Sequence, residues 1–177
     1  MGISAGLGTD ALLPGLVLVA SKTFTTTSSA QQIDNCFTSQ YDNYRVIYSG
    51  LGSTTSNDFV YCRMVNGTTA DTVANYYVCG YNTSTGAAVA TTWLAAQTQM
   101  RVGWIGNNYS EFVADFIAPQ LAQRTVVNSQ STSSSDVDFL VGTYGDLVNN
   151  NTQYEGLYLY PGSGTWSGTI RVYGYRN

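Results

Sequence analysis

The sequence has no histidine, a single lysine (Lys22) and only 10% charged residues among its 177 positions. Soluble domains ordinarily carry about 25% charged residues. Histidine is the side chain whose ordinary pKa lies near neutral pH, so acid–base chemistry would fall on nine aspartates, two glutamates, Lys22 and the phenols. This composition argues against an enzyme. It indicates a structural or binding protein, and no cofactor is expected.

Basic patches and long apolar runs are also missing. The net charge is −4 and the pI is about 4.4, so phosphate is repelled, and neither nucleic acid nor an anionic membrane is expected as a partner. The longest apolar run, residues 11–20, is interrupted by Pro14 and Gly15, whereas a membrane span needs about 20 residues. Lys22, the first cation, follows this run instead of preceding it, so no secretory signal is expected. Folding is expected in the cytoplasm where the chain is synthesised.

Cysteine is scarce and odd in number. The spacing of Cys36, Cys62 and Cys79 fits no zinc pattern, and no metal site is expected. Cys62 and Cys79 both fall inside predicted strands. The sequence therefore predicts buried, reduced thiols that behave as small apolar side chains, with no bridge between Cys62 and Cys79.

Alternation of apolar and polar residues is what the chain has in abundance. This pattern predicts about ten short strands separated by polar Gly, Asn and Ser turns, at residues 17–20, 44–48, 59–65, 76–81, 89–94, 100–105, 111–118, 124–128, 137–141, 154–160 and 168–175. Asn66-Gly67 is the strongest two-residue turn signal. The expected fold is all-β: an antiparallel β-sandwich, jelly-roll-like, with a short extended N-terminal arm.

Three segments are expected to depart from strand structure. Short helices are candidates at residues 29–36 and 94–99, and the QSTSSS segment at 130–135 reads as a low-complexity loop. Residues 1–16 form the expected arm and residues 17–177 the sandwich domain. The arm is glycine-rich but keeps large apolar side chains, at Ile3, Leu7, Leu12, Leu13 and Leu16. It could pack on its own domain or anchor the protein on a partner.

Two pairs of carboxylates could carry chemistry. Asp136 and Asp138 would share a face of a strand, as would Glu111 and Asp115. Calcium binding or a glycosidase pair would need such groups, but neither pair has further ligands or an orienting group nearby in the sequence. A charged strand start is the simpler interpretation of Asp136 and Asp138. No catalytic residue is assigned.

The 14 tyrosines are first of all sheet formers, and most are expected to be half-buried with the hydroxyl at the surface. Tyr is also favoured in protein interfaces and can stack on sugar rings. The sequence leaves subunit packing and glycan contact open.

Two stretches resemble a known group of proteins. They are NCFTSQYDNYRVI at residues 35–47 and GTWSGTIRVYGY at residues 164–175, and the segment ALLPGLVLVASKTF at 11–24 is similar to the lead-in of the same domain. Together they resemble small β-sandwich virion proteins of tailed bacteriophages, especially those of cyanobacterial and marine phages. The resemblance implies a tail-fibre, fibre-tip or capsid-decoration role. It transfers no binding residue.

One domain with a short arm, and without the repeats of a fibre shaft, favours a decoration protein over a complete tail fibre. The expected function is therefore a non-enzymatic virion structural protein, a capsid decoration or cement protein anchored by its N-terminal arm. Its expected partners are itself, as a homotrimer, and the major capsid protein or a tail protein. The alternative is a tail-fibre or receptor-binding module that contacts host surface glycan.

Overall fold

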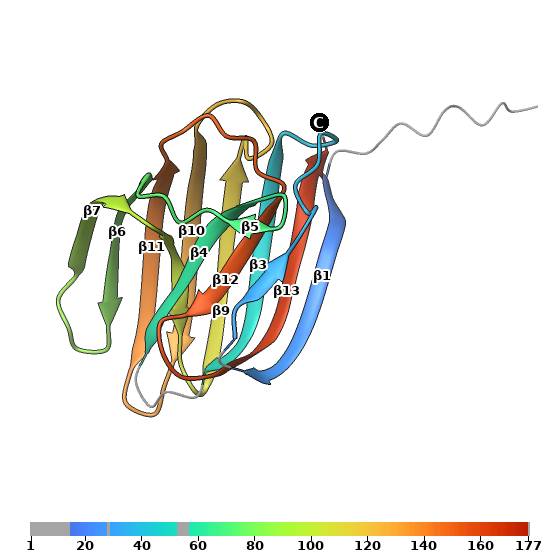
Figure 1. Cartoon of the computed structure of the whole chain (residues 1–177). Coiled ribbons are helices and arrows are strands. Elements are labelled where there is room, and N and C mark those ends of the chain that lie inside the picture. The colour runs from blue at the N-terminus through green and yellow to red at the C-terminus, as the bar shows by residue number, and fades with distance from the viewer. Residues whose placement is uncertain (1–14, 28, 53–56, 177) are drawn as a thin grey trace, which may run out of the picture.

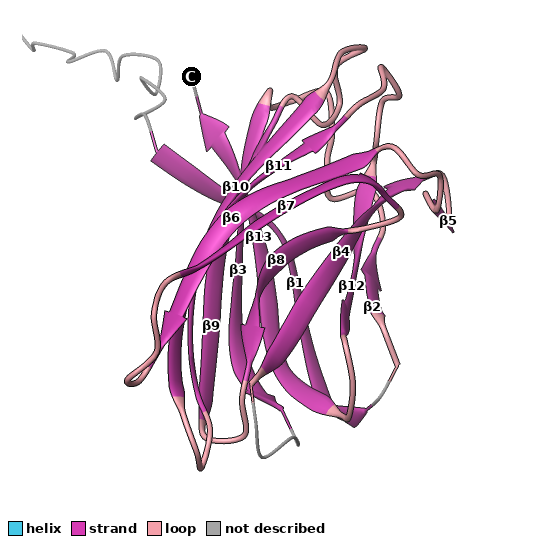
Figure 2. Ribbon diagram, turned by 90° about the vertical axis from the view of Figure 1, so that its left-hand side faces the viewer, coloured by secondary structure: helices cyan, strands magenta, loops and turns pink. Residues whose placement is uncertain are grey.

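The computed structural model describes residues 15–27, 29–52 and 57–176, and every regular element in these ranges is a β-strand. The strands form two antiparallel sheets that face each other (Figures 1 and 2). The larger sheet has eight strands, in the order β1 (Gly15–Thr27), β13 (Trp166–Arg176), β3 (Asn43–Gly52), β9 (Tyr109–Ile117), β10 (Thr125–Ser134), β11 (Phe139–Val148), β6 (Tyr76–Ser84) and β7 (Ala90–Gln97).

The smaller sheet has five strands. Its order is β2 (Gln31–Ile33), β12 (Gly156–Pro161), β4 (Asp58–Asn66) and β5 (Thr69–Ala70), with β8 (Met100–Ile105) also paired to β4. Strands distant in sequence are neighbours in both sheets, since β13 lies between β1 and β3 and β12 lies between β2 and β4. The predicted all-β antiparallel sandwich is confirmed.

The core lies between the two sheets and is built from the inward side chains of each strand. Alternation along β3 buries Tyr44, Val46 and Tyr48 while the residues between them face outward. Tyr48 packs its ring against Phe112 and Trp166. Large aromatic side chains therefore fill much of the space between the layers.

Both helix predictions are wrong. Gln31–Ile33 form β2, which pairs with β12, and residues 94–97 belong to β7, which pairs with β6. In both cases pairing to an existing sheet edge outweighs a weak local helix preference. The Asn66-Gly67 turn is confirmed, because it joins β4 to β5 and Gly67 has a φ of 62°.

The predicted low-complexity loop at residues 130–135 is also wrong over most of its length. Gln130–Ser134 continue β10, and Ser129, Ser131 and Ser133 are buried on its inner side. Strand β8 contacts β10 there. Small inward side chains let the two sheets approach closely at this point, so a serine-rich strand is favoured by packing and not by propensity.

The expected arm lies largely outside the described residues, which include none of Ile3, Leu7, Leu12 and Leu13. Leu16 is described and lies in β1, which begins at Gly15, two residues before the expected domain boundary. β1 is an edge strand of the larger sheet. The segment before Gly15 therefore joins the sandwich at a sheet edge.

All three cysteines are free thiols. Cys36 and Cys62 are buried, as predicted, and burial raises the pKa of Cys36 to about 12. The prediction of a buried Cys79 is wrong, because this residue lies on the outward side of β6, opposite Trp93 of β7. Among the described residues, no helix is long and apolar enough to cross a membrane.

Candidate functional sites

The outward side of the eight-stranded sheet, here called the wide face, carries most of the exposed apolar side chains. Fourteen large hydrophobic side chains are exposed in the described part of the chain, and the strand alternation places ten of them on this face. These ten are Leu16, Leu18, Leu51, Tyr81, Trp93, Tyr109, Ile117, Val126, Phe139 and Val141. Apolar side chains gathered on one face are typical of surfaces that bind another protein. The wide face therefore has the character of an interface.

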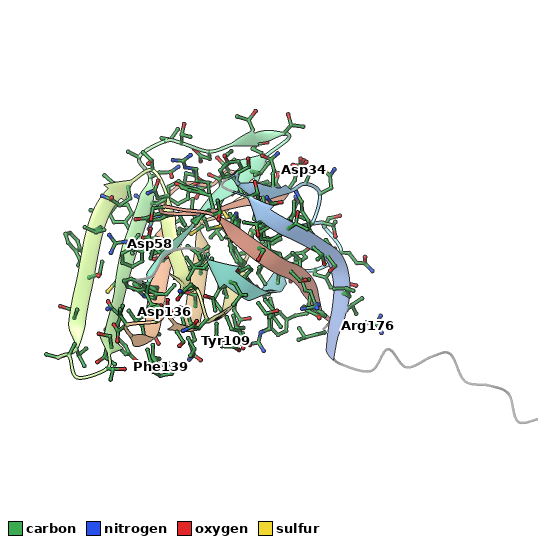
Figure 3. All side chains as sticks on the ribbon, turned by 90° about the horizontal axis from the view of Figure 1, so that it is seen from below. Asp34, Asp58, Tyr109, Asp136, Phe139 and Arg176 are labelled. Atoms are coloured by element: carbon green, nitrogen blue, oxygen red, sulfur yellow. The ribbon has the colours of Figure 1, made fainter. Side chains whose placement is uncertain are left out.

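Strand register brings several of these side chains into rows. Val126 of β10 lies opposite Ile117 of β9 and opposite Leu147 of β11. At the other end of the sandwich, Tyr109 and Phe139 flank Ser134 from its two neighbouring strands, and both are labelled in Figure 3. Trp93, at 73% exposure, stands at the β7 edge. The apolar surface thus extends across the sheet and does not stop at one strand.

Charge on the wide face is largely neutralised. Arg45 of β3 donates from Nε and Nη2 to the two carboxylate oxygens of Asp115 at 2.8 and 2.7 Å, and the Tyr175 hydroxyl donates to Asp115 at 2.7 Å. The hydrogen bonds from Arg45 lower the pKa of Asp115, with Tyr175 adding to the effect against partial burial. Such a bidentate pair is a rigid polar contact. Arg171 and Glu111, which also lie on this face, form no ion pair within the described part of the chain.

A shallow trough crosses β9, β10 and β11 on this face. Three hollows, of about 270, 460 and 370 Å³, share lining residues: Val113 and Gln130 join the first to the second, and Asp115 and Asn128 join the first to the third. Amides and hydroxyls line the trough and apolar side chains border it. A surface of this relief can receive side chains from another protein.

The outward side of the smaller sheet, here called the narrow face, is aromatic but is covered by its own contacts. The rings of Phe59 and Trp104 lie 3.9 Å apart between centroids, and Tyr61 packs on Tyr160 at 5.5 Å. The guanidinium of Arg101 lies 4.1 Å from the centre of the Phe59 ring. None of these four rings is among the exposed large hydrophobic side chains.

A second arginine holds the other end of the narrow face. Arg63 lies over the Tyr160 ring at 5.1 Å and donates to the Thr98 carbonyl and to Gln99, whose Oε1 also accepts from the Tyr160 hydroxyl. Each of the two cations thus lies over a ring, and that of Arg63 is also fixed by hydrogen bonds. The narrow face leaves little apolar surface that a partner could bury.

A third feature is an open pocket of about 720 Å³ at one end of the sandwich, here called the end pocket. It lies between the segment that follows β5 and the loop between β11 and β12. Asp71 is its central group: Oδ1 accepts from the Val73 amide at 2.9 Å, and Oδ2 accepts from the Tyr154 hydroxyl at 2.5 Å and from Asn75 at 3.3 Å. The side-chain oxygen of Asn75 is buried and has no hydrogen-bond partner.

The four carboxylates singled out in the sequence do not form a catalytic group. Asp136 and Asp138 do not share a strand face as predicted, because β11 begins only at Phe139. Asp136 accepts from Asn107, and Asp138 accepts from the Thr85 amide, so both tie loops together. The simpler interpretation, a charged strand start after a polar loop, is wrong as well, because residues 130–134 belong to β10 and both aspartates precede β11. Hydrogen bonds to Asn107 and Thr85, which are distant in sequence, hold the two carboxylates outside the strand.

Glu111 and Asp115 do share the outward side of β9, as predicted. Four residues along a strand correspond to roughly 13 Å, more than the 5–9.5 Å typical of glycosidase carboxylate pairs. Glu111 accepts from the Tyr109 hydroxyl, and Asp115 is paired with Arg45. Among the described residues, no group of three or more His, Cys, Asp or Glu side chains could hold a metal ion.

The three stretches that carry the sequence resemblance lie side by side. β1 pairs with β13, and β13 pairs with β3, so that Val172 lies opposite Val46. Any side chain at Gly174 would collide with the ring of Tyr41, and the Tyr44 hydroxyl donates to the Thr38 carbonyl at 2.5 Å. These motif residues support the fold. They explain why the stretches occur together, and they mark no binding site.

Sequence comparisons identify no relative, since no family model matches the chain and the search of curated proteins gives no match. Among solved structures, the CBM40 module of a Ruminococcus gnavus IT-sialidase, bound to α2,3-sialyllactose, is similar over 91% of this chain and 93% of that chain, at 12% identity and a TM-score of 0.33. Such similarity is too low to indicate a shared ligand.

Proposed function

We propose that the protein is a non-enzymatic structural protein of a bacteriophage particle, a capsid decoration protein that assembles as a homotrimer through its wide face and is anchored by its N-terminal arm. The observation that carries this proposal is the concentration of ten exposed apolar side chains on the wide face. The phage context rests on the resemblance of residues 35–47 and 164–175 to virion proteins of tailed phages.

The size of the wide face suits an interface between copies of this chain. Eight strands about 4.8 Å apart and roughly ten residues long present about 1,000 Å² of sheet. A standard protein interface buries about 800 Å² per partner. Burying the face therefore fits the area that a stable oligomer needs, while the self-covered narrow face stays in contact with water.

Opposite charges on different strands of the wide face favour a second copy of the chain as the partner. Arg171 of β13 and Glu111 of β9 have no ion pair among the described residues. In a ring of three copies, one patch of a subunit meets a different patch of the next. Arg171 of one copy can then pair with Glu111 of its neighbour, so that opposite charges meet at the contact.

Anchoring by the arm is the second part of the proposal. The arm joins the sandwich at the β1 edge, and its apolar side chains at Ile3, Leu7, Leu12 and Leu13 can bind a groove on the major capsid protein. Three arms on one trimer reinforce one another, because binding of the first raises the effective concentration of the others.

Deletion of residues 2–13 tests the anchor. Because β1 begins at Gly15, the truncated chain keeps every strand and should remain a folded trimer by circular dichroism and light scattering. It should no longer sediment with particles that lack the native protein. Normal incorporation of the truncated trimer would contradict anchoring by the arm.

A tail-fibre or receptor-binding module that contacts host surface glycan is a second candidate function. The end pocket favours it, because its lining of amides, hydroxyls and one carboxylate suits the hydroxyl groups of a sugar. Copy number separates the candidates. A decoration protein occurs in many copies over the capsid, whereas a receptor-binding module occurs in a few copies at the tail and, when blocked, prevents adsorption.

A further inference from the structure

We infer that the end pocket binds a neutral, hydroxyl-rich saccharide and rejects acidic sugars. This inference rests on the second candidate function, receptor binding, and adds the class of ligand to it. It is independent of the assembly through the wide face, because the residues that line the end pocket lie at the end of the sandwich and not on that face.

The size and lining of the pocket fit a sugar residue. Its volume of about 720 Å³ falls in the range of about 300–1,000 Å³ common for small-molecule sites. Side chains from the two sides of the opening bear both donors and acceptors, since Asn66 and Asn149 carry amides and Thr72 a hydroxyl. Adjacent hydroxyls of a saccharide donate and accept in the same way, so such a mixed lining is complementary to them.

An unsatisfied acceptor points to a ligand. The buried side-chain oxygen of Asn75 has no partner, although the amide nitrogen of the same side chain donates to Asp71. A buried acceptor without a hydrogen bond costs about 1–3 kcal/mol, a cost that a ligand hydroxyl donating to it would remove. The bond from Asn75 to Asp71 fixes the orientation of the amide, and its oxygen exposes almost no surface, so a ligand hydroxyl reaches it only with a shift of the Asn75 side chain.

The electrostatics of the pocket select against acidic ligands. Asp71 is the ionisable residue at its centre, and neither lysine nor arginine lines it. Glu155 lies close to the opening, where it accepts from the Gly67 amide. A carboxylate brought into this site would meet like charge without a compensating cation.

A site for a metal cation is disfavoured as well. Both oxygens of Asp71 already accept hydrogen bonds, and calcium needs six or more oxygen ligands.

Saturation-transfer NMR on the full-length protein tests the inference with four probes. Methyl β-galactoside and N-acetylglucosamine are the neutral sugars, and N-acetylneuraminic acid and glucuronic acid are the acidic ones. We expect saturation transfer to at least one neutral sugar and to neither acidic sugar at pH 7.

The variant Asn149→Ala tests the location of the site. It should weaken binding by about fivefold, the loss of one hydrogen bond. Asn149 is a suitable site because its side chain makes no hydrogen bond with the residues that the structure describes. Asn108→Ala in the β8–β9 turn, at the opposite end of the sandwich, is the matched control.

The outcomes separate the inference from the function on which it rests. Binding of an acidic sugar at the affinity of the neutral ones, or neutral-sugar binding unchanged in Asn149→Ala, overturns the inference and leaves receptor binding standing. Adhesion of the protein to host cells without saturation transfer to any of the four sugars also overturns it. Absence of both sugar binding and cell adhesion overturns the inference and the receptor-binding candidate together.

Discussion

The two outer faces of this sandwich are both rich in large side chains, but only one of them is complete without a partner. On the narrow face, aromatic rings pack on one another and two arginines lie over them, so none of these rings is among the exposed hydrophobic side chains. On the wide face, ten large hydrophobic side chains remain exposed around a single neutralised ion pair. Exposed apolar surface indicates a partner only where the chain has not covered that surface itself.

The largest expected effect is on assembly. Replacing Val126 and Val141 by lysine places two charges on the wide face, and burying an unpaired charge in an interface costs several kcal/mol. The double variant should be a folded monomer by light scattering and circular dichroism. Val137→Lys is the matched control, because Val137 is 72% exposed in the loop before β11, outside the face. A trimeric double variant would show that the wide face is not the interface.

The second prediction contrasts one ring on each face. Phe59→Ala on the narrow face removes contacts with Trp104 and Arg101 and should lower the free energy of unfolding by about 2–3 kcal/mol. Trp93→Ala on the wide face should change it by less than about 0.5 kcal/mol, since this side chain makes few contacts within the chain.

Urea unfolding in the monomeric Val126→Lys/Val141→Lys background measures both effects without a contribution from assembly. In the unmodified background, Trp93→Ala should instead weaken the trimer. Equal losses of monomer stability for the two variants would remove the distinction between the faces.

The space between the sheets gives a third, pH-dependent prediction. Asp146 is 2% exposed, so burial raises its pKa well above the ordinary value of 3.8, and the backbone amide and positive charge of Arg101 only partly offset this. Because the pKa of Asp146 is higher in the folded state than in the unfolded state, the contribution of Asp146 to the free energy of unfolding is fully present at low pH. This contribution is lost as the pH rises from the unfolded-state pKa towards the folded-state pKa.

Asp146→Asn should therefore match the parent protein near pH 3 and become the more stable of the two as the pH rises. The difference should grow by up to about 1.4 kcal/mol per pH unit until the folded-state pKa is passed. Urea unfolding between pH 3 and pH 8 in the monomeric background measures it. A constant difference across this range would mean that Asp146 titrates normally.

The smallest expected effect sharpens how copies meet. Arg171→Glu and Glu111→Arg should each weaken the trimer by about 1 kcal/mol, through like-charge contact between neighbouring subunits. The double charge reversal should recover most of the loss. Dilution experiments followed by sedimentation velocity measure the three dissociation constants. Additive losses in the double variant would show that Arg171 and Glu111 do not pair across the interface.

The sequence predicted most of this fold because alternation is a local signal that the sheets obey. Residues 100–105 were predicted as a strand, and β8 has those bounds. Gln130–Ser134 were missed because their serines are buried for a long-range reason, the approach of β8 to β10. No local pattern reports that contact. The helix at 29–36 failed for the same reason, since β2 pairs with the distant β12. The helix at 94–99 failed because β7 pairs with β6, the strand before it in the chain.

The candidate sites were less accessible to sequence reasoning. Of the 14 tyrosines, Tyr81 and Tyr109 are exposed and as many of the others are buried as half-buried, so the expectation that most are half-buried is wrong. The exposed surface is instead mainly aliphatic, and its position on one face follows from the register of eight strands. The end pocket joins Asp71 to Tyr154, which are far apart in sequence. The run of asparagines at 149–151 lies between the strands predicted at 137–141 and 154–160, and it does not by itself indicate a pocket.

Light scattering of the unmodified, full-length protein over a wide dilution range tests the central claim most directly. The account predicts a mass three times that of the 19.1 kDa chain at high concentration, falling to that of one chain only on extensive dilution. A mass of one chain at every concentration, with the protein folded, would contradict the claim that the wide face is an interface between copies.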